Sequence, residues 1–305
     1  MSVLPTGEQF RLRSGDAEVV VVEVGATLRS YRAGGREVLD GFGERDLADG
    51  SRGQVLAPWP NRLRDGRYTW DGAAHQTPLS EPETANAIHG LVRFSPWQVT
   101  DRSSGAVTLE HLLHPQPGYP FPLRLQLRYE LSSAGLRVTT TATNDGDVPL
   151  PYGEGHHPYL AAGPGLLVDD CSLVAPGGVR LETDARQLPT GAADVTGGPY
   201  DLRAGRVVGD LVIDDCFTDL DRDGDGLAWA RLTAPDGRGA ALWLDTAYPY
   251  LQLFTGDVLP EPRRRRGLAV EPMTCPPNAF ATGESVLRLE PGESTTGTWG
   301  IAPLG

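Results

Sequence analysis

Four short segments of the chain combine residue types that bind hydroxyl groups or exchange protons. In the first segment, residues 57–66, prolines fix the backbone around Trp59, and Asn61 and Arg62 follow closely. A rigid loop that presents an amide, a guanidinium and an indole suits a sugar, because fixed donors bind hydroxyl groups and a flat ring covers the C–H face. Taken alone, the same residues also fit a structured surface loop.

The other three segments each carry an imidazole or a carboxyl group. His89 precedes a glycine, which by itself is typical of a turn or of a core histidine. His156 and His157 are adjacent, and adjacent side chains on an extended backbone face opposite ways, so only one of them can point into a given pocket. Glu271 ends an apolar strand, where burying a carboxylate is costly unless binding or chemistry uses it.

The elements that must position these groups are strands, because apolar residues recur at every second position along much of the chain. The alternation over residues 123–131 resumes at 136–142 after a four-residue turn, which predicts a hairpin. A second hairpin is expected around a turn at residues 235–237. Further strands are expected at residues 19–22, 250–254, 268–271, 286–289 and 296–301. No window keeps a helical period beyond about two turns. The sequence therefore predicts an all-β chain, and because no composition break suggests a linker, residues 1–305 are expected to form one domain.

The composition argues against several classes of partner. The 305 residues include 40 acidic side chains and 27 basic ones, all of them arginine, for a net charge of −13. An acid excess of this size repels phosphate backbones and anionic lipid headgroups, so we expect neither nucleic acid nor a membrane as a partner. No run of eighteen apolar residues predicts a membrane helix, and no secretory signal opens the chain. The three cysteines are widely spaced and odd in number, which favours reduced thiols and a cytoplasmic location.

The order and spacing of the motifs resemble those of the aldose 1-epimerase, or galactose mutarotase, family. The resemblance is carried by the run Pro-Asn-Arg-Leu-Arg-Asp-Gly at residues 60–66, by Asn-Ala-Ile-His-Gly at 86–90 and by Trp97, and it extends over nearly the whole chain. It implies a large single-domain antiparallel β-sandwich of the galactose mutarotase type that binds a monosaccharide in an open cleft. It also implies a monomer or homodimer that needs no cofactor and no metal.

The resemblance further implies roles for individual residues. His157 matches the family's general acid, and Glu271 matches its general base. The substrate-binding positions that match are Arg62, His89 and Asp214, with Asp215 as the alternative to Asp214, and two further residues expected to face the sugar are Asn61 and Gln252.

The reaction implied is the interconversion of the α and β anomers of a free aldose. The anomeric hydroxyl must lose a proton while the ring oxygen gains one, so an acid and a base must act together. We expect Glu271 to act as a carboxylate and His157 as an imidazolium, with neighbouring carboxylates holding the pKa of His157 above its usual value of roughly 6.5. We also expect the two groups at opposite edges of one bound pyranose.

Three alternatives remain open at the level of sequence. An epimerase of a 6-phosphorylated or sulfonated hexose would need arginines on the anion, and these could come from Arg62, Arg64, Arg67 or the run at residues 263–266. A non-catalytic carbohydrate-binding protein would bind sugar without changing its optical rotation. A glycoside hydrolase would need Glu271 and Asp214 to flank one glycosidic bond.

Overall fold

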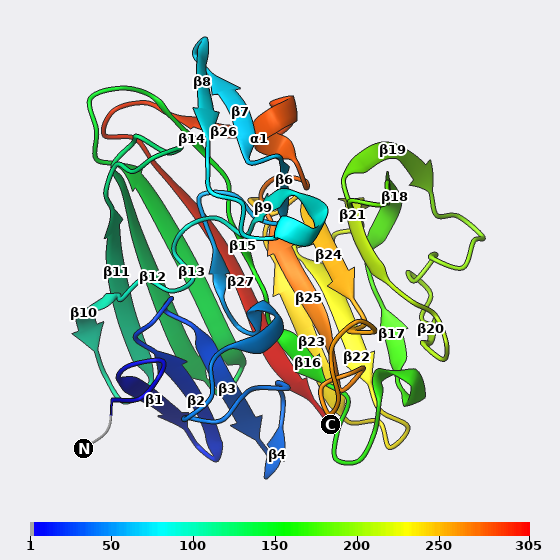
Figure 1. The fold of residues 1–305 in the computed structure, drawn as a ribbon. Helices are drawn as coiled ribbons and strands as arrows, with labels where there is room; N and C mark the ends of the chain where they lie inside the picture. The colour runs from blue at the N-terminus through cyan, green and yellow to red at the C-terminus, as the bar shows by residue number, and fades with distance from the viewer. Residues whose placement is uncertain (1–2) are drawn as a thin grey trace.

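Strands with alternating buried and exposed residues make up much of the chain (Figure 1). The computed structural model describes residues 3–305. In β12 (Leu123–Ser132), every second side chain from Leu123 to Leu131 is buried, and the side chains between them are partly or fully exposed. This strand pairs antiparallel with β13 (Gly135–Asn144) through a tight turn. The hairpin that the alternation predicts is therefore confirmed.

The largest sheet has nine strands, and its neighbouring strands pair antiparallel. In spatial order they are β10 (Gln98–Arg102), β11 (Ala106–Leu113), β12, β13, β27 (Ser294–Leu304), β23 (Gly239–Leu244), β22 (Ala228–Thr233), β17 (Ser172–Val174) and β20 (Arg206–Val207). The second predicted hairpin is the β22–β23 pair. The strand predicted at residues 296–301 lies within β27.

The second large sheet has eight strands and is also antiparallel. They are β19 (Pro189–Asp194), β18 (Gly177–Thr183), β21 (Asp214–Leu220), β24 (Tyr250–Phe254), β25 (Gly267–Met273), β15 (Gly155–His156), β5 (Val55–Leu56) and, paired with the far end of β25, β16 (Tyr159–Ala161). The strand predicted at residues 250–254 is β24, and the one predicted at 268–271 lies within β25.

Smaller elements complete the fold. A four-stranded sheet consists of β1 (Gln9–Ser14), β2 (Ala17–Val22), β3 (Leu28–Ala33) and β4 (Arg36–Glu37). Three strand pairs are β14 (Leu150–Tyr152) with β26 (Leu287–Leu289), β6 (Arg62–Arg64) with β9 (Asn86–Ile88), and β7 (Arg67–Trp70) with β8 (Ala73–Gln76). The helices are the short 3₁₀ turns η1 (Asp49–Ser51), η2 (Pro82–Thr84) and η3 (Val168–Asp170), and one α-helical turn, α1 (Ala279–Thr282). Within residues 3–305, none of these helices is long and apolar enough to span a membrane.

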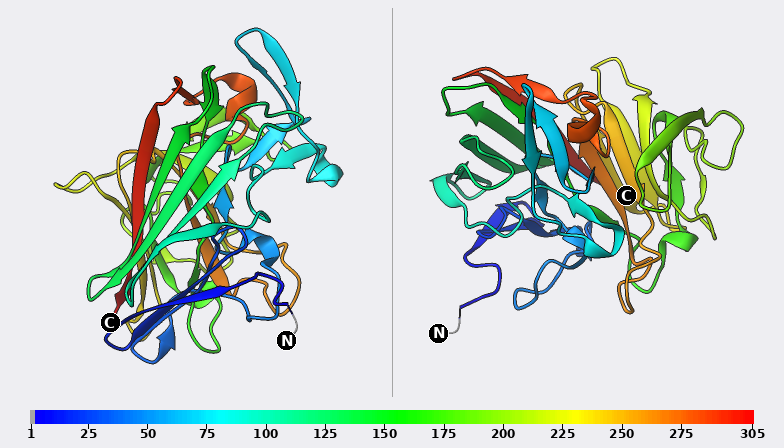
Figure 2. Two further views of the ribbon diagram at one scale, coloured as in Figure 1. Left: turned by 90° about the vertical axis from the view of Figure 1, so that its left-hand side faces the viewer. Right: turned by 45° about the horizontal axis from the view of Figure 1, so that its top comes forward.

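The two large sheets face each other across the main hydrophobic core (Figure 2). His156 of β15 shows this directly, because its Nε2 atom lies 3.0 Å from the hydroxyl of Thr140 on β13. Its ring also lies 5.0 Å from that of Trp299 on β27. The expected antiparallel β-sandwich is therefore confirmed, and the division of the chain into a single domain stays a prediction.

Candidate active site

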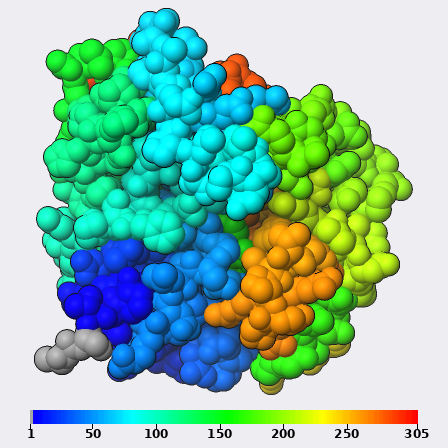
Figure 3. Space-filling model, viewed as in Figure 1, coloured from blue at the N-terminus to red at the C-terminus, as the bar shows by residue number. Residues whose placement is uncertain are grey.

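One pocket of about 300 Å³ brings together the seven residues that the sequence singles out. It opens on the face of the molecule shown in Figure 3, where the segments near residues 50, 85 and 260 meet around a hollow. The predicted residues that line it are Asn61, Arg62, His89, His157, Asp214, Gln252 and Glu271. They come from distant parts of the chain, so the fold itself assembles the pocket.

The strand register of the eight-stranded sheet sets three of these side chains on one face. Gln252 of β24 lies directly opposite Glu271 of β25, and opposite residues in an antiparallel pair share a face. Asp214 of β21 lies beside them and accepts a hydrogen bond of 2.8 Å from Nε2 of Gln252. Its neighbour Asp215 instead pairs with Arg180 at 2.7 Å and does not line the pocket. Asp214 is therefore the member of this pair that faces the pocket.

His157 and Glu271 contact each other at the floor of the pocket. Nε2 of His157 lies 3.3 Å from Oε1 of Glu271, and both residues are almost fully buried, at 5% and 2% exposure. The backbone of His157 is fixed by a hydrogen bond from its N–H to Gln54 and by one that its carbonyl accepts from Gly53. Its ring stacks on that of Tyr159 at 5.1 Å. The expectation that the two groups stand at opposite edges of a sugar is therefore wrong, since they lie side by side.

Burial controls the protonation of this pair. Removal from water disfavours the charged form of each group, so the pKa of His157 falls to about 3 and the pKa of Glu271 rises well above its usual value. The nearby Asp214 carboxylate raises the pKa of Glu271 further. The prediction that carboxylates raise the pKa of His157 is wrong, because desolvation lowers this pKa and the nearby charges of Arg52 and Arg93 lower it further. Both shifts favour the uncharged forms of the two side chains, and therefore a pair without net charge.

His89 is held in a defined tautomer by the backbone of Asn61. The Asn61 N–H donates to Nδ1 of His89 at 3.1 Å, and the His89 N–H donates to the Asn61 carbonyl at 2.9 Å. Because Nδ1 accepts, the proton of the neutral ring lies on Nε2. Burial lowers the pKa of His89 well below its usual value, which keeps the ring neutral. His89 is thus a fixed hydrogen-bond donor at the pocket wall.

Arg62 is paired with an acid inside the same pocket. Its Nε and Nη2 atoms donate to the two carboxylate oxygens of Glu81, both at 2.9 Å, and such a two-point pair fixes the plane of the guanidinium. The Glu81 carboxylate also accepts hydrogen bonds from the side chains of Thr84 and Asn86. Arg62 therefore presents its remaining donors in a defined direction while its charge is largely balanced.

Arg93 is a pocket residue that the sequence reasoning missed. It donates to the Ser51 hydroxyl at 3.0 Å and to the Ile88 carbonyl at 3.2 Å. Within residues 3–305 no carboxylate lies within 4 Å of its guanidinium, although burial lowers its pKa to about 10 and leaves it charged. Its position four residues after His89 in the sequence could have marked it as a residue of the same pocket. The pocket thus contains one arginine whose charge has no acidic partner.

The expectation that an indole covers one wall of the pocket is wrong. Trp59 does not face the pocket, because it is buried at 2% exposure and packs against Phe280 in the core. The aromatic rings that line the pocket belong to Tyr159 and Phe254. The prolines indicate that the backbone of this loop is rigid. They do not indicate whether the side chain of Trp59 points into the core or into the pocket.

The other candidate arginines also lie elsewhere. Arg64 is 3.8 Å from Asp184, and Arg67 donates to Gln76. Of the run at residues 263–266, the buried Arg265 pairs with Asp169 and Asp257. Arg263 and Arg266 line a different cavity. None of these side chains lines the pocket. Across residues 3–305, no group of three or more His, Cys, Asp or Glu side chains is arranged to hold a metal ion.

A second buried carboxyl lies behind the pocket, on the segment that leads to His157. Glu154 is 2% exposed and accepts hydrogen bonds from the hydroxyls of Tyr152 at 2.7 Å and Tyr248 at 2.6 Å. Burial raises its pKa to about 7, against the effect of these two donors. Glu154 does not line the pocket, so its proton affects the stability of the segment and not the pocket charge.

Comparison with known proteins identifies the family of the chain. The sequence profile of the aldose 1-epimerase family matches residues 8–302. The chain is 32% identical over 289 residues to the uncharacterized protein YihR of Escherichia coli K12, covering 94% of this chain and 91% of that protein. It is 28% identical over 218 residues to the galactose mutarotase of Rattus norvegicus, covering 66% of this chain and 63% of that protein.

Solved structures share the fold. A galactose mutarotase-like protein from Clostridium acetobutylicum superimposes with a TM-score of 0.84 at 21% identity, covering 96% of this chain and 94% of that one. The galactose 1-epimerase from Lactobacillus acidophilus gives a TM-score of 0.77 at 22% identity, with 94% and 92% covered. The predicted galactose mutarotase-like fold is confirmed.

We predict that Glu154 makes the protein less stable as the pH rises. A pKa raised from 4.5 to about 7 means that the folded protein holds this proton more tightly than the unfolded chain. Its contribution is complete below the unfolded pKa and is lost as the pH rises through 7, on the order of 3 kcal/mol in the free energy of unfolding. Urea unfolding of Glu154→Gln should show a flatter pH dependence than the parent, whereas the exposed control Glu44→Gln should match the parent. Equal pH dependence in all three proteins would contradict the assignment.

Proposed function

The chain belongs to the aldose 1-epimerase family, and we propose that it interconverts the α and β anomers of a free aldose by opening and reclosing the sugar ring. The observation that carries this proposal is the contact between His157 and Glu271 at the floor of a polar pocket. An acid and a base in contact, with hydroxyl-binding groups around them, supply what the reaction requires.

The side-by-side geometry suits the chemistry better than an arrangement across the sugar. In a pyranose the anomeric hydroxyl oxygen and the ring oxygen are bonded to the same carbon. The base that removes a proton from one and the acid that protonates the other must therefore be neighbours, as Nε2 of His157 and Oε1 of Glu271 are at 3.3 Å. A sugar resting on this pair brings both oxygens within reach, and it does not have to fit between the two side chains.

A single proton is enough for the pair to work in both directions. We propose that Glu271 takes the proton of the anomeric hydroxyl while His157 gives a proton to the ring oxygen, after which the aldehyde rotates and closure reverses both transfers. The neutral resting pair and the carboxylate–imidazolium form hold the same number of protons and differ only by transfer along their contact. Sugar hydroxyls that donate to the unpartnered Oε2 of Glu271 would favour the carboxylate form. Each proton-transfer group contributes roughly 10² to 10⁴ in rate.

The remaining pocket residues are proposed to hold the sugar. His89 presents an Nε2–H donor, Asp214 presents a carboxylate, and Gln252 has a buried Oε1 atom without a partner within residues 3–305. Arg62 and Asn61 line the same wall. Such a set alternates donors and acceptors, which is what a ring bearing several hydroxyl groups needs.

A second candidate is an epimerase of an anionic hexose, and the unpaired charge of Arg93 favours it. A guanidinium that is largely withdrawn from water and bonded only to a hydroxyl and a carbonyl has capacity for an anion. A phosphate or sulfonate on the sugar would supply the missing counter-charge. The other arginines named from the sequence do not support this reading, because Arg62 is already paired and Arg64 and Arg67 lie outside the pocket.

We predict that Glu271→Gln and His157→Asn each lower the rate of mutarotation by about 10²-fold or more, because each removes one proton-transfer group. Freshly dissolved α anomers followed by polarimetry or proton NMR will measure the rate above the spontaneous reaction. The exposed residues Glu182 and His114 provide matched controls as Glu182→Gln and His114→Asn, which should retain the parent rate. A parent protein that binds sugars without accelerating mutarotation would instead be a non-catalytic binding protein.

The pH profile provides an independent prediction. Because burial lowers the pKa of His157 to about 3, the pair gains a second proton only in strong acid. The value of kcat/KM should therefore stay level between roughly pH 7 and pH 5, and not fall as it would for a histidine with the ordinary pKa of roughly 6.5. A loss of activity with a midpoint near 6.5 that disappears in His157→Asn would show that the ring is not desolvated in the working enzyme.

The anionic candidate is tested by Arg93→Gln. If an anionic sugar is the substrate, this change should lower kcat/KM for a 6-phosphorylated or sulfonated hexose by about 10-fold or more, since one charge-assisted contact is lost. The value for a neutral hexose should change much less. An equal loss for both sugars would assign Arg93 to the structure of the pocket wall and would exclude it as an anion contact.

A further inference from the structure

Arg52 is a fully buried charge to which the reaction described above assigns no role. Its side chain is 1% exposed and does not line the substrate pocket. Nη2 of Arg52 lies 2.9 Å from a carboxylate oxygen of Asp40, and Nη1 lies 3.0 Å from one of Asp49. Nε and Nη1 also donate to the backbone carbonyls of the same two residues, at 2.8 Å and 3.2 Å. Burying a guanidinium is costly even when it is paired, and these contacts hold it in one orientation.

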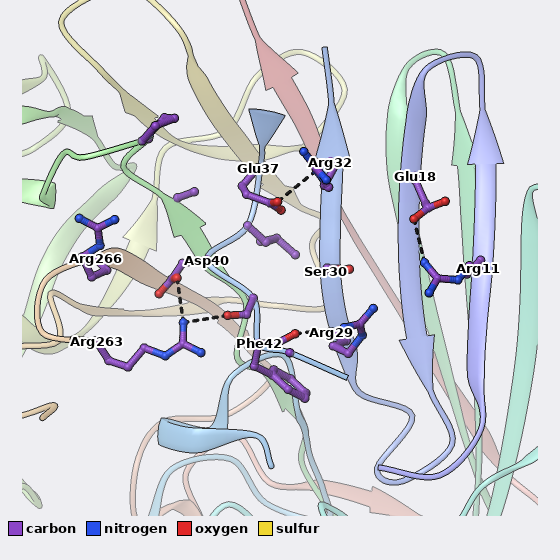
Figure 4. A pocket seen from close by; sticks show the side chains of 16 residues that line it. Arg11, Glu18, Arg29, Ser30, Arg32, Glu37, Asp40, Phe42, Arg263 and Arg266 are labelled. Carbon is purple, nitrogen blue, oxygen red and sulfur yellow. Dashed lines mark hydrogen bonds and ion pairs between the residues drawn. The ribbon is translucent and has the colours of Figure 1, made fainter. Parts of the chain in front are cut away.

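A second arginine, Arg263, shares both of these carboxylates. It lies 3.3 Å from Asp40 and 3.5 Å from Asp49. Figure 4 shows its hydrogen bond to Asp40. The two arginines and the two aspartates therefore balance one another, and the carboxylates that hold Arg52 are themselves held.

The guanidinium of Arg52 lies over the ring of Tyr159. Its central carbon is 4.1 Å from the centre of the ring, which is within the range of a cation–π contact. Tyr159 is 1% exposed, and its hydroxyl donates to the carbonyl of Gly50 at 2.9 Å. The ring of Tyr159 is therefore held at its face by Arg52 and at its hydroxyl by Gly50.

Tyr159 in turn contacts the ring of His157, the general acid of the proposed reaction. The two ring centres are 5.1 Å apart, and the ring planes differ by 17°. Catalytic histidines are usually oriented by a hydrogen bond at the second ring nitrogen. Among residues 3–305, however, the buried Nδ1 of His157 has no such partner. Stacking on Tyr159 and an edge contact with His89 at 5.4 Å therefore set the plane of the imidazole.

Arg52 also precedes the two residues that hold the backbone of His157. The N–H of Gly53 donates to the His157 carbonyl at 2.8 Å, and the N–H of His157 donates to the Gln54 carbonyl at 3.1 Å. A displacement of Arg52 is therefore passed to Gly53 and Gln54 along the chain. The side chain and the backbone of Arg52 both lead to the same histidine.

We propose that Arg52 is a positioning residue for the ring-opening reaction, and that it holds the Tyr159 ring against which the imidazole of His157 keeps its orientation. This inference rests on the role proposed above for His157. Proton transfer requires accurate placement, and a misplacement of about 1 Å can lower a rate by about 10²-fold. Sugar binding should depend little on Arg52, because Arg52 does not line the pocket.

The first test compares the mutarotation kinetics of Arg52→Met, Tyr159→Leu and the double variant. Each single change should lower kcat by about 10-fold or more, and KM should stay within about 2-fold of the parent in Arg52→Met. The double variant should lose little more than the larger single loss, because both changes break the same series of contacts. Arg52→Lys keeps a charge for Asp40 and Asp49 and so allows the test even if Arg52→Met does not fold. Its compact ammonium lacks the plane of a guanidinium and should restore only part of kcat.

Arg265→Met is the matched control for the loss of a buried ion pair. Arg265 is 6% exposed and pairs with Asp169 and Asp257, as Arg52 pairs with two aspartates. Among residues 3–305, however, its guanidinium lies over no aromatic ring. This change should lower stability and leave kcat at the parent value.

The second test is the imidazole NMR signal of His157 in protein labelled at histidine, assigned by its absence in His157→Asn. Arg52→Met should shift this signal, because movement of the Tyr159 ring changes the magnetic environment of the ring stacked on it. The signal of the exposed His114 should stay unchanged. The readout needs no activity, so it separates the positioning role from the proposed function.

The proposal would be overturned by parent values of kcat in Arg52→Met and Arg52→Lys, or by an equal loss of kcat in Arg265→Met. Fully additive losses in the double variant would show that Arg52 does not act through Tyr159. A parent protein without mutarotase activity would refute the proposed function, and a shifted His157 signal would then still support the placement of the ring by Arg52. An unmoved signal in Arg52→Met would refute that placement in either case.

Discussion

The contact between a buried imidazole and a buried carboxyl group is the constraint on which the substrate pocket depends. His157 and Glu271 lie within 3.3 Å of each other with almost no exposed surface. Neither group is stable as an isolated charge at such a depth, because the loss of hydration costs more than the contact returns. Burial therefore favours a pair without net charge, in which one proton is shared. A site that must both take and give a proton gains from this arrangement, since its resting state needs no proton from solvent to begin.

Two different structural features position the side chains around this pair. On one side the ladder of the eight-stranded sheet sets the positions, since pairing of β24 with β25 places Gln252 opposite Glu271. On the other side the pocket is built from loops, and there the close approach of two backbone segments fixes the positions of the side chains. Gly90 has a φ of +65°, and a Cβ at this residue would clash with the carbonyl of Ala57. Only glycine fits, which explains why His89 is followed by one and how the imidazole keeps its place beside Asn61.

The sequence predicts the sheet part of the site well and the loop part less well. The period of two over residues 123–142 and 250–254 is a local property, and the structure has strands at both places. The motif residues also gather in one pocket, some of them on paired strands and the others at strand ends and turns beside these strands. Trp59 and Arg93 were misjudged for a different reason. Whether an indole packs in the core, or a guanidinium has an acidic partner, depends on side chains that are distant in sequence. Burial also decided the pKa of His157, and no sequence pattern reports how deep a side chain lies.

A chain of charged and aromatic contacts leads from Arg263, on the loop between β24 and β25, to the floor of the substrate pocket. Asp40 pairs with Arg263 through one oxygen and with the buried Arg52 through the other, at 2.9 Å. The guanidinium of Arg52 lies 4.1 Å from the centre of the Tyr159 ring, on which the His157 ring stacks. Arg52 is 1% exposed and relies on Asp40 and Asp49 for its counter-charge. Arg52 and Arg263 share both Asp40 and Asp49, so the guanidinium beside the Tyr159 ring is held by carboxylates that lie outside the substrate pocket.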